Sequence, residues 1–471
     1  MPAPGVTDPH ARSAFRLAFP SIVENFFHSA VYMVDAMFLA TLGESELAAS
    51  SFAGMLMWRL NATVASHQYA FGAYIARRWG EGRHALAREA ASHAVTLAAV
   101  LGMVVVIAMM PLLELVLGLL SGSAEVVPTA YVYIVPILLA FPLQQARVVL
   151  SSSLRAAGDT VSPQIATLIV NLVNVFLNWV LIFGNLGAPR LGIMGAGIGT
   201  ALAIATGALF LFFRARFGIR PRKLFADAPR RAGASQRDSA VVALPTRGAR
   251  LWLPSVTPRI ARLAGPSLIE EILITIGFLG FFRMITDCGT TAMAAHSAVS
   301  AIESLSFNAG AGFAFAAGTL VGQCLGRRDK ALALRSMQLC VLFAVVVMGG
   351  LGICFAAFPG VFVRAFLPPD AGPDFAYTAT ILLLIVAVEQ PVLGATQVLG
   401  GSLRGAGDTL SPTIAQIAGT VCVRLGLGYY LAFGLGWGVV GLYWATVVDW
   451  TLRTSVLSYL VFRGRWSRIH A

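Results

Sequence analysis

The stretch that decides the fold is SLRAAGDTVSP at residues 153–163, because it returns as SLRGAGDTLSP at residues 402–412. The two copies share nine of eleven residues across a separation of 249 positions. A period this long describes two fused halves rather than a solenoid of short repeats. Further matches occur at separations of 246 and 250 positions: LAFPSIVE at 17–24 with LAGPSLIE at 263–270, and FG at 183–184 with FG at 433–434.

The composition indicates that the duplicated protein lies in a membrane. Hydrophobic residues make up 57% of the 471 residues and charged residues 12%, against roughly 25% charged in an average soluble domain. We predict an all-α integral membrane protein with about twelve transmembrane helices, six in each of two pseudo-symmetric lobes, because about 20 apolar residues cross a bilayer. The predicted spans are 15–42, 47–76, 90–120, 127–152, 162–187, 193–214, 263–287, 292–322, 332–360, 376–402, 411–435 and 438–462.

The basic residues predict the topology. Of the 34 Lys and Arg, 27 fall on one side of the predicted spans, whereas the opposite loops carry only Arg190 and Arg364. By the positive-inside rule both termini are cytoplasmic, in a multi-pass protein of the cell's inner membrane. We predict an N-lobe at 1–214, a cytoplasmic linker rich in Arg and Pro at 215–262, and a C-lobe at 263–471.

Several other function classes lack their motifs. The sequence has no GxxxxGK[ST] phosphate loop and no HExxH pair. GAGIGT at 195–200 opens an apolar helix, so close helix packing explains its glycines better than a dinucleotide site. The five cysteines have no metal-binding spacing. We therefore expect no catalytic site, no metal and no cofactor, and we read the net charge of +12 as topology rather than nucleic-acid binding.

Several motifs are spread over nearly the whole chain. They are LRAAGDT and LRGAGDT, NLVNVFLNWVLIFG at 171–184, LGIMGAGIGTALA at 191–203, CGTTAMAAH at 288–296, VGQCLGRRD at 321–329 and VDAMFLATLG at 34–43. Together they resemble the multidrug and toxic compound extrusion (MATE) transporters. IESLSF at 302–307 and Arg283 look more like the DNA-damage-inducible (DinF-type) branch of that family.

The resemblance implies a function. It implies two lobes that alternate between inward-open and outward-open states, and the export of organic cations or amphipathic drugs in exchange for H⁺ or Na⁺. It also suggests that a monomer acts alone. Two alternatives stay open: a flippase for lipid-linked saccharides, which would need dense cationic charge in its cavity, and a membrane-embedded enzyme, for which no catalytic constellation stands out.

The N-lobe carries a polar face inside the predicted membrane. Asp35 lies in the first span, and Asn171, Asn174 and Asn178 have spacings of three and four, which puts them on one helical face. Ionisable groups in hydrocarbon are costly and are functional candidates. The polar face is nearly confined to the N-lobe, because the residues at the repeat offsets of 246 and 249 are Phe281, Thr420, Val423 and Leu427.

The family's N-lobe cation site matches Asp35, Asn174, Asn178 and Thr200. A carboxylate with amide oxygens either supplies hard oxygen ligands or takes up a proton. Some family members have Asp where this chain has Asn178, and a site with one formal negative charge favours H⁺ over Na⁺. The alternative is that the asparagines only bridge helices.

Other candidates surround this site in the sequence. Pro20 matches a family proline in the first helix, and we expect protonation of Asp35 to change how that helix bends there. The secondary charged candidates are Glu270, Glu271, Arg283, Glu303 and Glu389, with Arg59, Arg147, Arg424 and Arg453 as possible partners of the acids. The cavity-lining candidates are Met33, Met37, Phe38, Met55, Met57 and Trp58, for which core or lipid packing is the alternative.

Overall fold

The computed structural model describes residues 34–35, 37–39, 41–65, 68–121, 126–217, 257–365, 373–464 and 466. Every regular element in these ranges is helical, with no strand among them. Seven of the described helices are long and apolar enough to cross a membrane, or eight if a pair bent by 51° is counted as one span. The predicted all-α class is confirmed.

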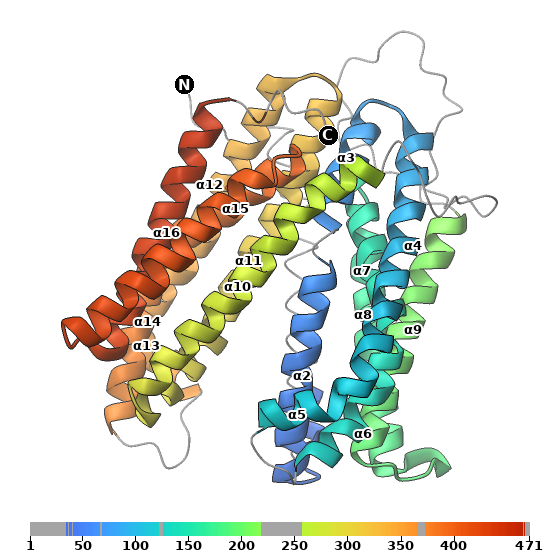
Figure 1. The fold of residues 1–471 in the computed structure, drawn as a ribbon, viewed down its shortest axis with the longest axis vertical. Coiled ribbons are helices and arrows are strands. Elements are labelled where there is room, and N and C mark those ends of the chain that lie inside the picture. The colour runs from blue at the N-terminus through green and yellow to red at the C-terminus, as the bar shows by residue number, and fades with distance from the viewer. Residues whose placement is uncertain are drawn as a thin grey trace. The chain divides into compact units, whose positions relative to one another are not determined.

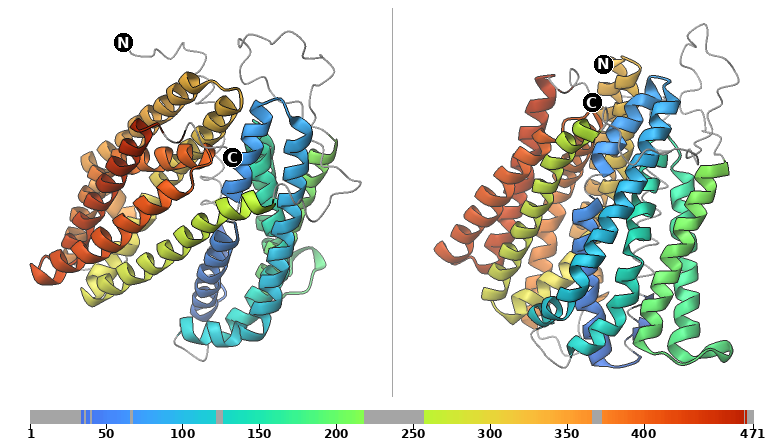
Figure 2. Two further views of the ribbon diagram at one scale, coloured as in Figure 1. Left: turned by 45° about the horizontal axis from the view of Figure 1, so that its top comes forward. Right: turned by 45° about the vertical axis from the view of Figure 1, so that its right-hand side comes forward.

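The described residues form two compact units, which we call the N unit (within 23–260) and the C unit (from 261 onward). In both views of Figure 2 the helices of each unit run side by side along its length. The helices of the N unit, labelled in Figure 1, are α2 (Glu44–Ala65), α3 (Gln68–Gly80), α4 (His84–Met109), η1 (Met110–Leu112), α5 (Leu113–Ser121), α6 (Val126–Leu139), α7 (Phe141–Ala156), α8 (Val161–Phe183), η2 (Asn185–Gly187) and α9 (Ile193–Phe217).

The C unit repeats this order with longer unbroken helices. The predicted linker at 215–262 lies mostly outside the described residues, so the predicted lobe bounds stay a prediction. The helices are α10 (Thr257–Asp287), which begins just before the unit boundary, α11 (Thr290–Gly326), α12 (Lys330–Ala357), α13 (Pro359–Ala365), α14 (Pro373–Gly405), α15 (Leu410–Ile417), η3 (Ala418–Leu427), η4 (Tyr430–Gly434) and α16 (Gly438–Phe462).

The repeated AGDT string forms the same helix–turn–helix junction in both units. After α7, Gly158 has φ 97°, and after α14, Gly407 has φ 89°. Glycine adopts this left-handed conformation without steric cost. Asp159 then accepts from the backbone N of Ser162 over 3.0 Å, and Asp408 accepts from that of Ser411 over 3.0 Å. Each aspartate caps the next helix, so the turn geometry explains why this string is repeated.

The drift in repeat separation from 249 to 250 has a structural cause. Helix α8 is α-helical throughout, whereas its counterpart contains a π-helical stretch at η3. A π-turn accommodates one extra residue in a helix. At a separation of 249, Thr420 corresponds to Asn171, and both are buried. At a separation of 250, Gly428 corresponds to Asn178, and both are buried.

This insertion corrects one of the expected equivalences. Because the extra residue lies before Gly428, the counterpart of Asn178 is Gly428 rather than Leu427. The simple offset ignored a one-residue insertion that no local sequence signal marks.

Helix packing in the N unit depends on the GAGIGT glycines. A Cβ atom at Gly195 would lie 2.6 Å from the carbonyl oxygen of Leu181 on α8. At Gly197 and Gly199 it would overlap the Tyr133 carbonyl oxygen on α6 and Oδ1 of Asn178 on α8. Helix α9 therefore lies close against α8 and α6, which confirms the packing interpretation of these glycines.

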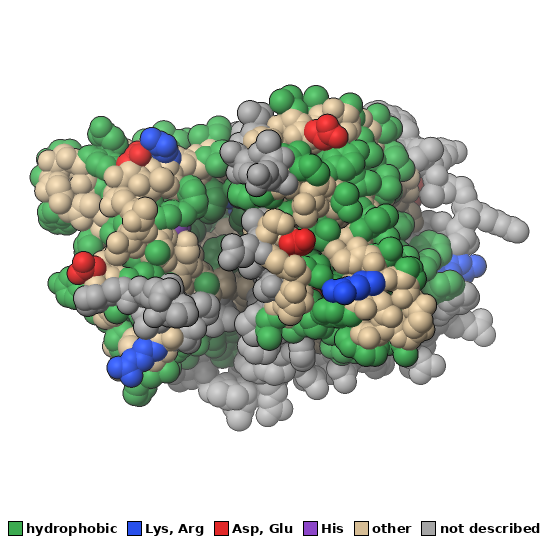
Figure 3. All heavy atoms as spheres, turned by 90° about the horizontal axis from the view of Figure 1, so that it is seen from below, with side chains coloured by type: hydrophobic (Ala, Val, Ile, Leu, Met, Phe, Trp, Pro, Cys, Tyr) green, Lys and Arg blue, Asp and Glu red, His purple; other side chains and the backbone are tan. Residues whose placement is uncertain are grey.

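The outside of the molecule is apolar, as hydrocarbon requires. Large hydrophobic side chains such as Ile107, Leu172 and Ile353 are more than half exposed. Such exposed apolar side chains suit a lipid environment. Figure 3 looks along the helices at one of their ends, where hydrophobic side chains surround isolated acidic and basic ones.

Candidate functional site

The N unit brings together four of the predicted site residues. Asn174 and Asn178 lie one turn apart on α8 and are almost fully buried. Thr200 lies on α9, which packs against α8. Asp35 belongs to a helical stretch described at 34–35 and is partly buried. Nδ2 of Asn178 donates to Oδ1 of Asp35 over 2.8 Å and contacts Oδ1 of Asn174 at 3.4 Å.

The Asn174 amide fits its neighbours in two orientations. In one, Nδ2 donates to Oγ1 of Thr200 over 3.0 Å, and Oδ1 faces the carboxyl group of Asp35. In the other, Nδ2 donates to both Asp35 oxygens, at 2.8 and 3.0 Å, and Oδ1 accepts from Thr200 over 3.0 Å. The first orientation suits a protonated Asp35, which can donate, and the second suits an ionised Asp35, which only accepts.

Three other predicted N-lobe positions lie apart from this set or outside the described residues. Asn171 is buried on the same face of α8, but its Nδ2 has no hydrogen-bond partner among the described residues. Pro20 lies outside the described residues, and so does Met33. The expected hinge at Pro20 therefore stays a prediction.

The cavity candidates have different environments. Met37 is 62% exposed and Trp58 is 56% exposed, with the guanidinium of Arg59 4.2 Å from its ring centroid. Met55 is also exposed, whereas Phe38 packs edge-on against Phe183, with ring centroids 5.7 Å apart. Phe38 is therefore partly a packing residue, and the other three present side chains at the surface of the N unit.

Glu270 takes part in a structural contact of the C unit. It is buried on α10, accepts from Nη2 of Arg404, and accepts from Oγ1 of Thr413 over 3.4 Å. Arg404 belongs to the repeated LRGAGDT string, so this ion pair ties α10 to the end of α14. Its neighbour Glu271 is only half-buried.

Arg283 is not part of a buried cluster. Its side chain is 76% exposed and forms an i,i+4 ion pair with Asp287 over 3.0 Å. Arg147 likewise bonds within its own helix, with Nε donating to Oε1 of Gln144 over 3.1 Å. These two contacts do not involve the acids that the sequence predicted as partners.

Two acids of the C unit, the buried Glu389 and the partly buried Glu303, are close together. Glu389 on α14 accepts from Oγ1 of Thr446 over 2.7 Å and lies within hydrogen-bonding reach of Glu303 on α11. Arg424 is near enough to act electrostatically on both carboxyl groups.

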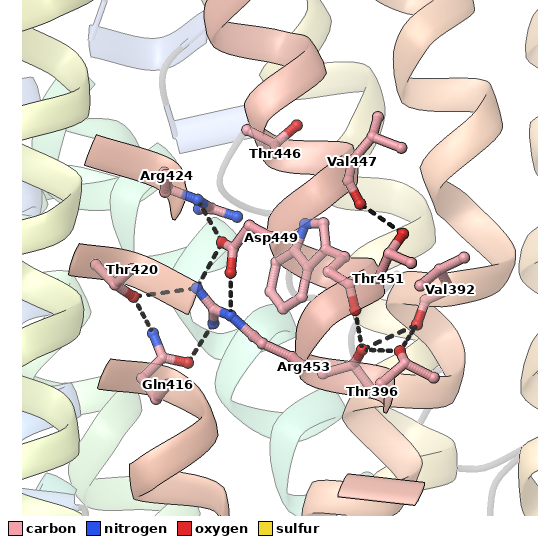
Figure 4. Close-up of polar contacts among 12 residues, drawn as sticks. Val392, Thr396, Gln416, Thr420, Arg424, Thr446, Val447, Asp449, Thr451 and Arg453 are labelled. Atoms are coloured by element: carbon pink, nitrogen blue, oxygen red, sulfur yellow. Dashed lines mark hydrogen bonds and ion pairs between the residues drawn. The ribbon is translucent and has the colours of Figure 1, made fainter. Parts of the chain in front are cut away.

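Asp449 is the functional candidate that sequence reasoning missed. It is fully buried on α16 and binds two arginines, Arg424 over 2.8 Å and Arg453 over 2.5 Å (Figure 4). Arg453 also donates to Gln416 and Thr420. The signal in the sequence was an Asp–Arg pair at i,i+4 inside an apolar span, which is costly in hydrocarbon unless paired.

These features define a multi-pass helical membrane protein built from two homologous halves, with a buried polar site that differs between the halves. The MatE family model matches residues 20–180 and 266–430. The chain therefore belongs to the MatE family, which confirms the resemblance to MATE transporters. Membership also establishes that the chain is a transporter and not an enzyme.

Relatives are similar along most of their length. The chain is 26% identical over 470 residues to "Probable multidrug resistance protein NorM" of Thermotoga maritima, covering 97% of this chain and 93% of that protein. It is 27% identical over 447 residues to the protein of the same name from a Synechococcus strain, covering 91% and 88%.

Solved structures show the same fold. A MOP superfamily transporter from Pyrococcus furiosus has a TM-score of 0.85 and 19% identity, covering 97% of this chain and 96% of that one. The Vibrio cholerae MATE transporter VcmN in its bent form has a TM-score of 0.82 and 18% identity, covering 98% and 97%. At these identities the likeness shows the fold alone, and the DinF-type branch stays a prediction.

Proposed function

We propose that the protein is an H⁺-coupled antiporter that exports organic cations or amphipathic drugs by alternating access. Its membership of the MatE family and the name of its relatives, multidrug resistance protein, support the export of drugs. The observation that supports a proton as the coupling ion is the contact of Asp35 with Asn174 and Asn178 inside the N unit.

The Asn174 amide supports a proton as the coupling ion. Both protonation states of Asp35 can satisfy their hydrogen bonds without movement of the backbone, because the amide turns over and Thr200 changes from acceptor to donor. An acid in hydrocarbon is costly when it is ionised and unpaired. A site that accommodates both states lowers this cost and lets the proton exchange during transport.

The charge of the site also favours H⁺ over Na⁺. Asp35 is the only carboxylate in this group of bonded residues, and the described residues contain no cluster of three His, Cys, Asp or Glu. A metal cation binds best where several oxygen ligands and carboxylates converge. We also propose that the protein lies in the inner membrane with both termini in the cytoplasm. A monomer acts alone in this proposal, and the first helix bends at Pro20.

The test is efflux of ethidium from proteoliposomes that contain the full-length protein. A pH gradient, or a Na⁺ gradient of equal size, is imposed on the parent, with protein-free vesicles as the control. We expect efflux under the pH gradient alone. Efflux only under the Na⁺ gradient would contradict proton coupling, and no efflux under either would bring the flippase alternative forward.

A further inference from the structure

The C unit holds a different set of side chains at the positions equivalent to the Asp35 site. The neighbouring helix hairpins match, since Leu191 N donates to the Leu181 carbonyl over 2.9 Å and Trp437 N donates to the Leu431 carbonyl over 3.1 Å. Thr446 therefore corresponds to Thr200, and Phe281 matches Asp35 at the same separation of 246. Arg424 precedes Gly428 by four residues, as Asn174 precedes Asn178. Where the N unit has an acid and an amide, the C unit has an aromatic ring and a permanent cation.

Arg424 lies in a setting that suits a cation. Its guanidinium carbon is 5.0 Å from the ring centroid of Trp450 and 5.8 Å from that of Phe281. Aromatic faces attract cations at such distances. Nε of Arg424 pairs with Asp449 over 2.8 Å, and its side chain keeps 23% exposure, whereas Asp449 is fully buried. The cation therefore lies at the accessible edge of the cluster.

Asp449 does not depend on Arg424 for charge balance. Arg453 binds both of its oxygens, through Nε over 2.5 Å and Nη2 over 2.6 Å, and is itself buried. Gly419 leaves room for this pair, because a Cβ atom there would overlap Oδ1 of Asp449. The Asp449–Arg453 pair is neutral by itself, so the charge of Arg424 is available to balance other acids.

Glu303 and Glu389 are those acids. Their carboxyl groups lie within hydrogen-bonding reach of one another, and the charge of Arg424 acts electrostatically on both. Two ionised carboxylates this close repel one another, so a neighbouring cation stabilises the pair. Arg424 supplies that cation, and together with the two aromatic rings the acid pair forms surroundings that suit a monovalent organic cation.

We infer that Arg424 is a tethered cation that fills a substrate site of the C unit, where the cationic group of an exported drug binds between Phe281, Trp450 and the Glu303–Glu389 pair. This inference rests on the proposed export of organic cations. The π-helical stretch that carries Arg424 supports displacement, because such single-residue insertions are common at functional sites. A bound substrate takes over the contacts of the guanidinium, which moves toward the accessible side.

The test measures binding of tetraphenylphosphonium to the full-length protein in detergent by isothermal titration calorimetry. Arg424→Met removes the competing charge and keeps the chain length. We expect the Kd to fall about tenfold, as it would if Arg424 vacated the site in about a tenth of parent molecules. Adding Glu389→Gln to this variant is expected to reverse the gain. Arg283→Met removes an exposed arginine of the same unit and is expected to change nothing.

Folding is checked by thermal unfolding of each variant. If Arg424→Met does not fold, Trp450→Leu carries the test, with a severalfold weaker Kd expected from loss of one aromatic face. If the variant that is tested, Arg424→Met or otherwise Trp450→Leu, folds and binds tetraphenylphosphonium with an unchanged Kd, the inference is overturned. Parent vesicles that export ethidium while Arg424→Met gains no affinity would overturn this inference alone, whereas a parent that exports nothing would overturn the proposed function.

Discussion

Nδ2 of Asn178 donates a hydrogen bond to Oδ1 of Asp35 over 2.8 Å, across 143 positions of sequence. The contact depends on Gly199, because a Cβ atom there would overlap Oδ1 of the same Asn178 amide. Helix α9 thus positions the residue that holds the acid.

Gly199→Ala is expected to lower pH-gradient-driven efflux about tenfold, since a hydrogen bond to a charged group contributes about 1.5–3 kcal/mol. The added methyl group pushes the Asn178 amide away from Asp35. Ethidium efflux at matched protein content checks this. Gly118→Ala is the control, because a Cβ atom there meets nothing within 4 Å. Equal efflux from the two variants would show that Gly199 does not position the site.

Asn178→Asp is expected to make efflux respond to a Na⁺ gradient. The substitution places a second carboxylate beside Asp35, and added negative charge increases the affinity of an oxygen site for metal cations. Efflux under a Na⁺ gradient at constant pH is the measurement. Asn171→Asp makes the same change on the same face of α8, outside the hydrogen-bonded set. A Na⁺ response in both variants, or in neither, would contradict the prediction.

Arg404→Met is expected to destabilise the protein by about 3–5 kcal/mol, because it leaves the buried carboxylate of Glu270 without its ionic partner. Denaturant unfolding in detergent measures the loss. Arg283→Met breaks an ion pair that is largely exposed and should cost under about 1 kcal/mol. If the two variants were equally stable, Glu270–Arg404 would not be the structural tie that its burial indicates.

Asp408→Ala is expected to cost about 1 kcal/mol of unfolding free energy, through loss of the cap on α15. Asp408→Asn keeps a side-chain acceptor and should cost less. The same unfolding assay compares the two. An alanine variant as stable as the asparagine variant would mean that the repeated aspartate has another role.

Most of the fold could be predicted because the repeated residues are the ones that the backbone requires. Gly158 and Gly407 adopt positive φ, and Asp159 and Asp408 cap the helices that follow. These demands are local, so they leave a recognisable string in each half. The spacing of Asn174 and Asn178 is local in the same way, since the helical period alone puts them on one face.

What the sequence did not reveal depends on longer-range or subtler physics. The one-residue insertion at η3 changes which residue is equivalent to Asn178, and burial along the helix is what reveals it. Asp449 was missed because the buried arginines were matched with glutamates, although Arg453 lies one turn away on its own helix. Arg283 was placed among buried charges, yet the i,i+4 Asp287 already satisfies it at the surface.

The most direct test of the account is proton release on substrate binding by purified protein in weakly buffered detergent solution. Tetraphenylphosphonium is added to the parent and to Asp35→Asn, and a pH indicator follows the solution. Exchange at Asp35 predicts release of up to about half a proton per substrate bound by the parent at its midpoint of protonation, where half of the molecules carry the proton, and none from Asp35→Asn. Equal release from both proteins, or binding to the parent without release, would contradict proton coupling at Asp35.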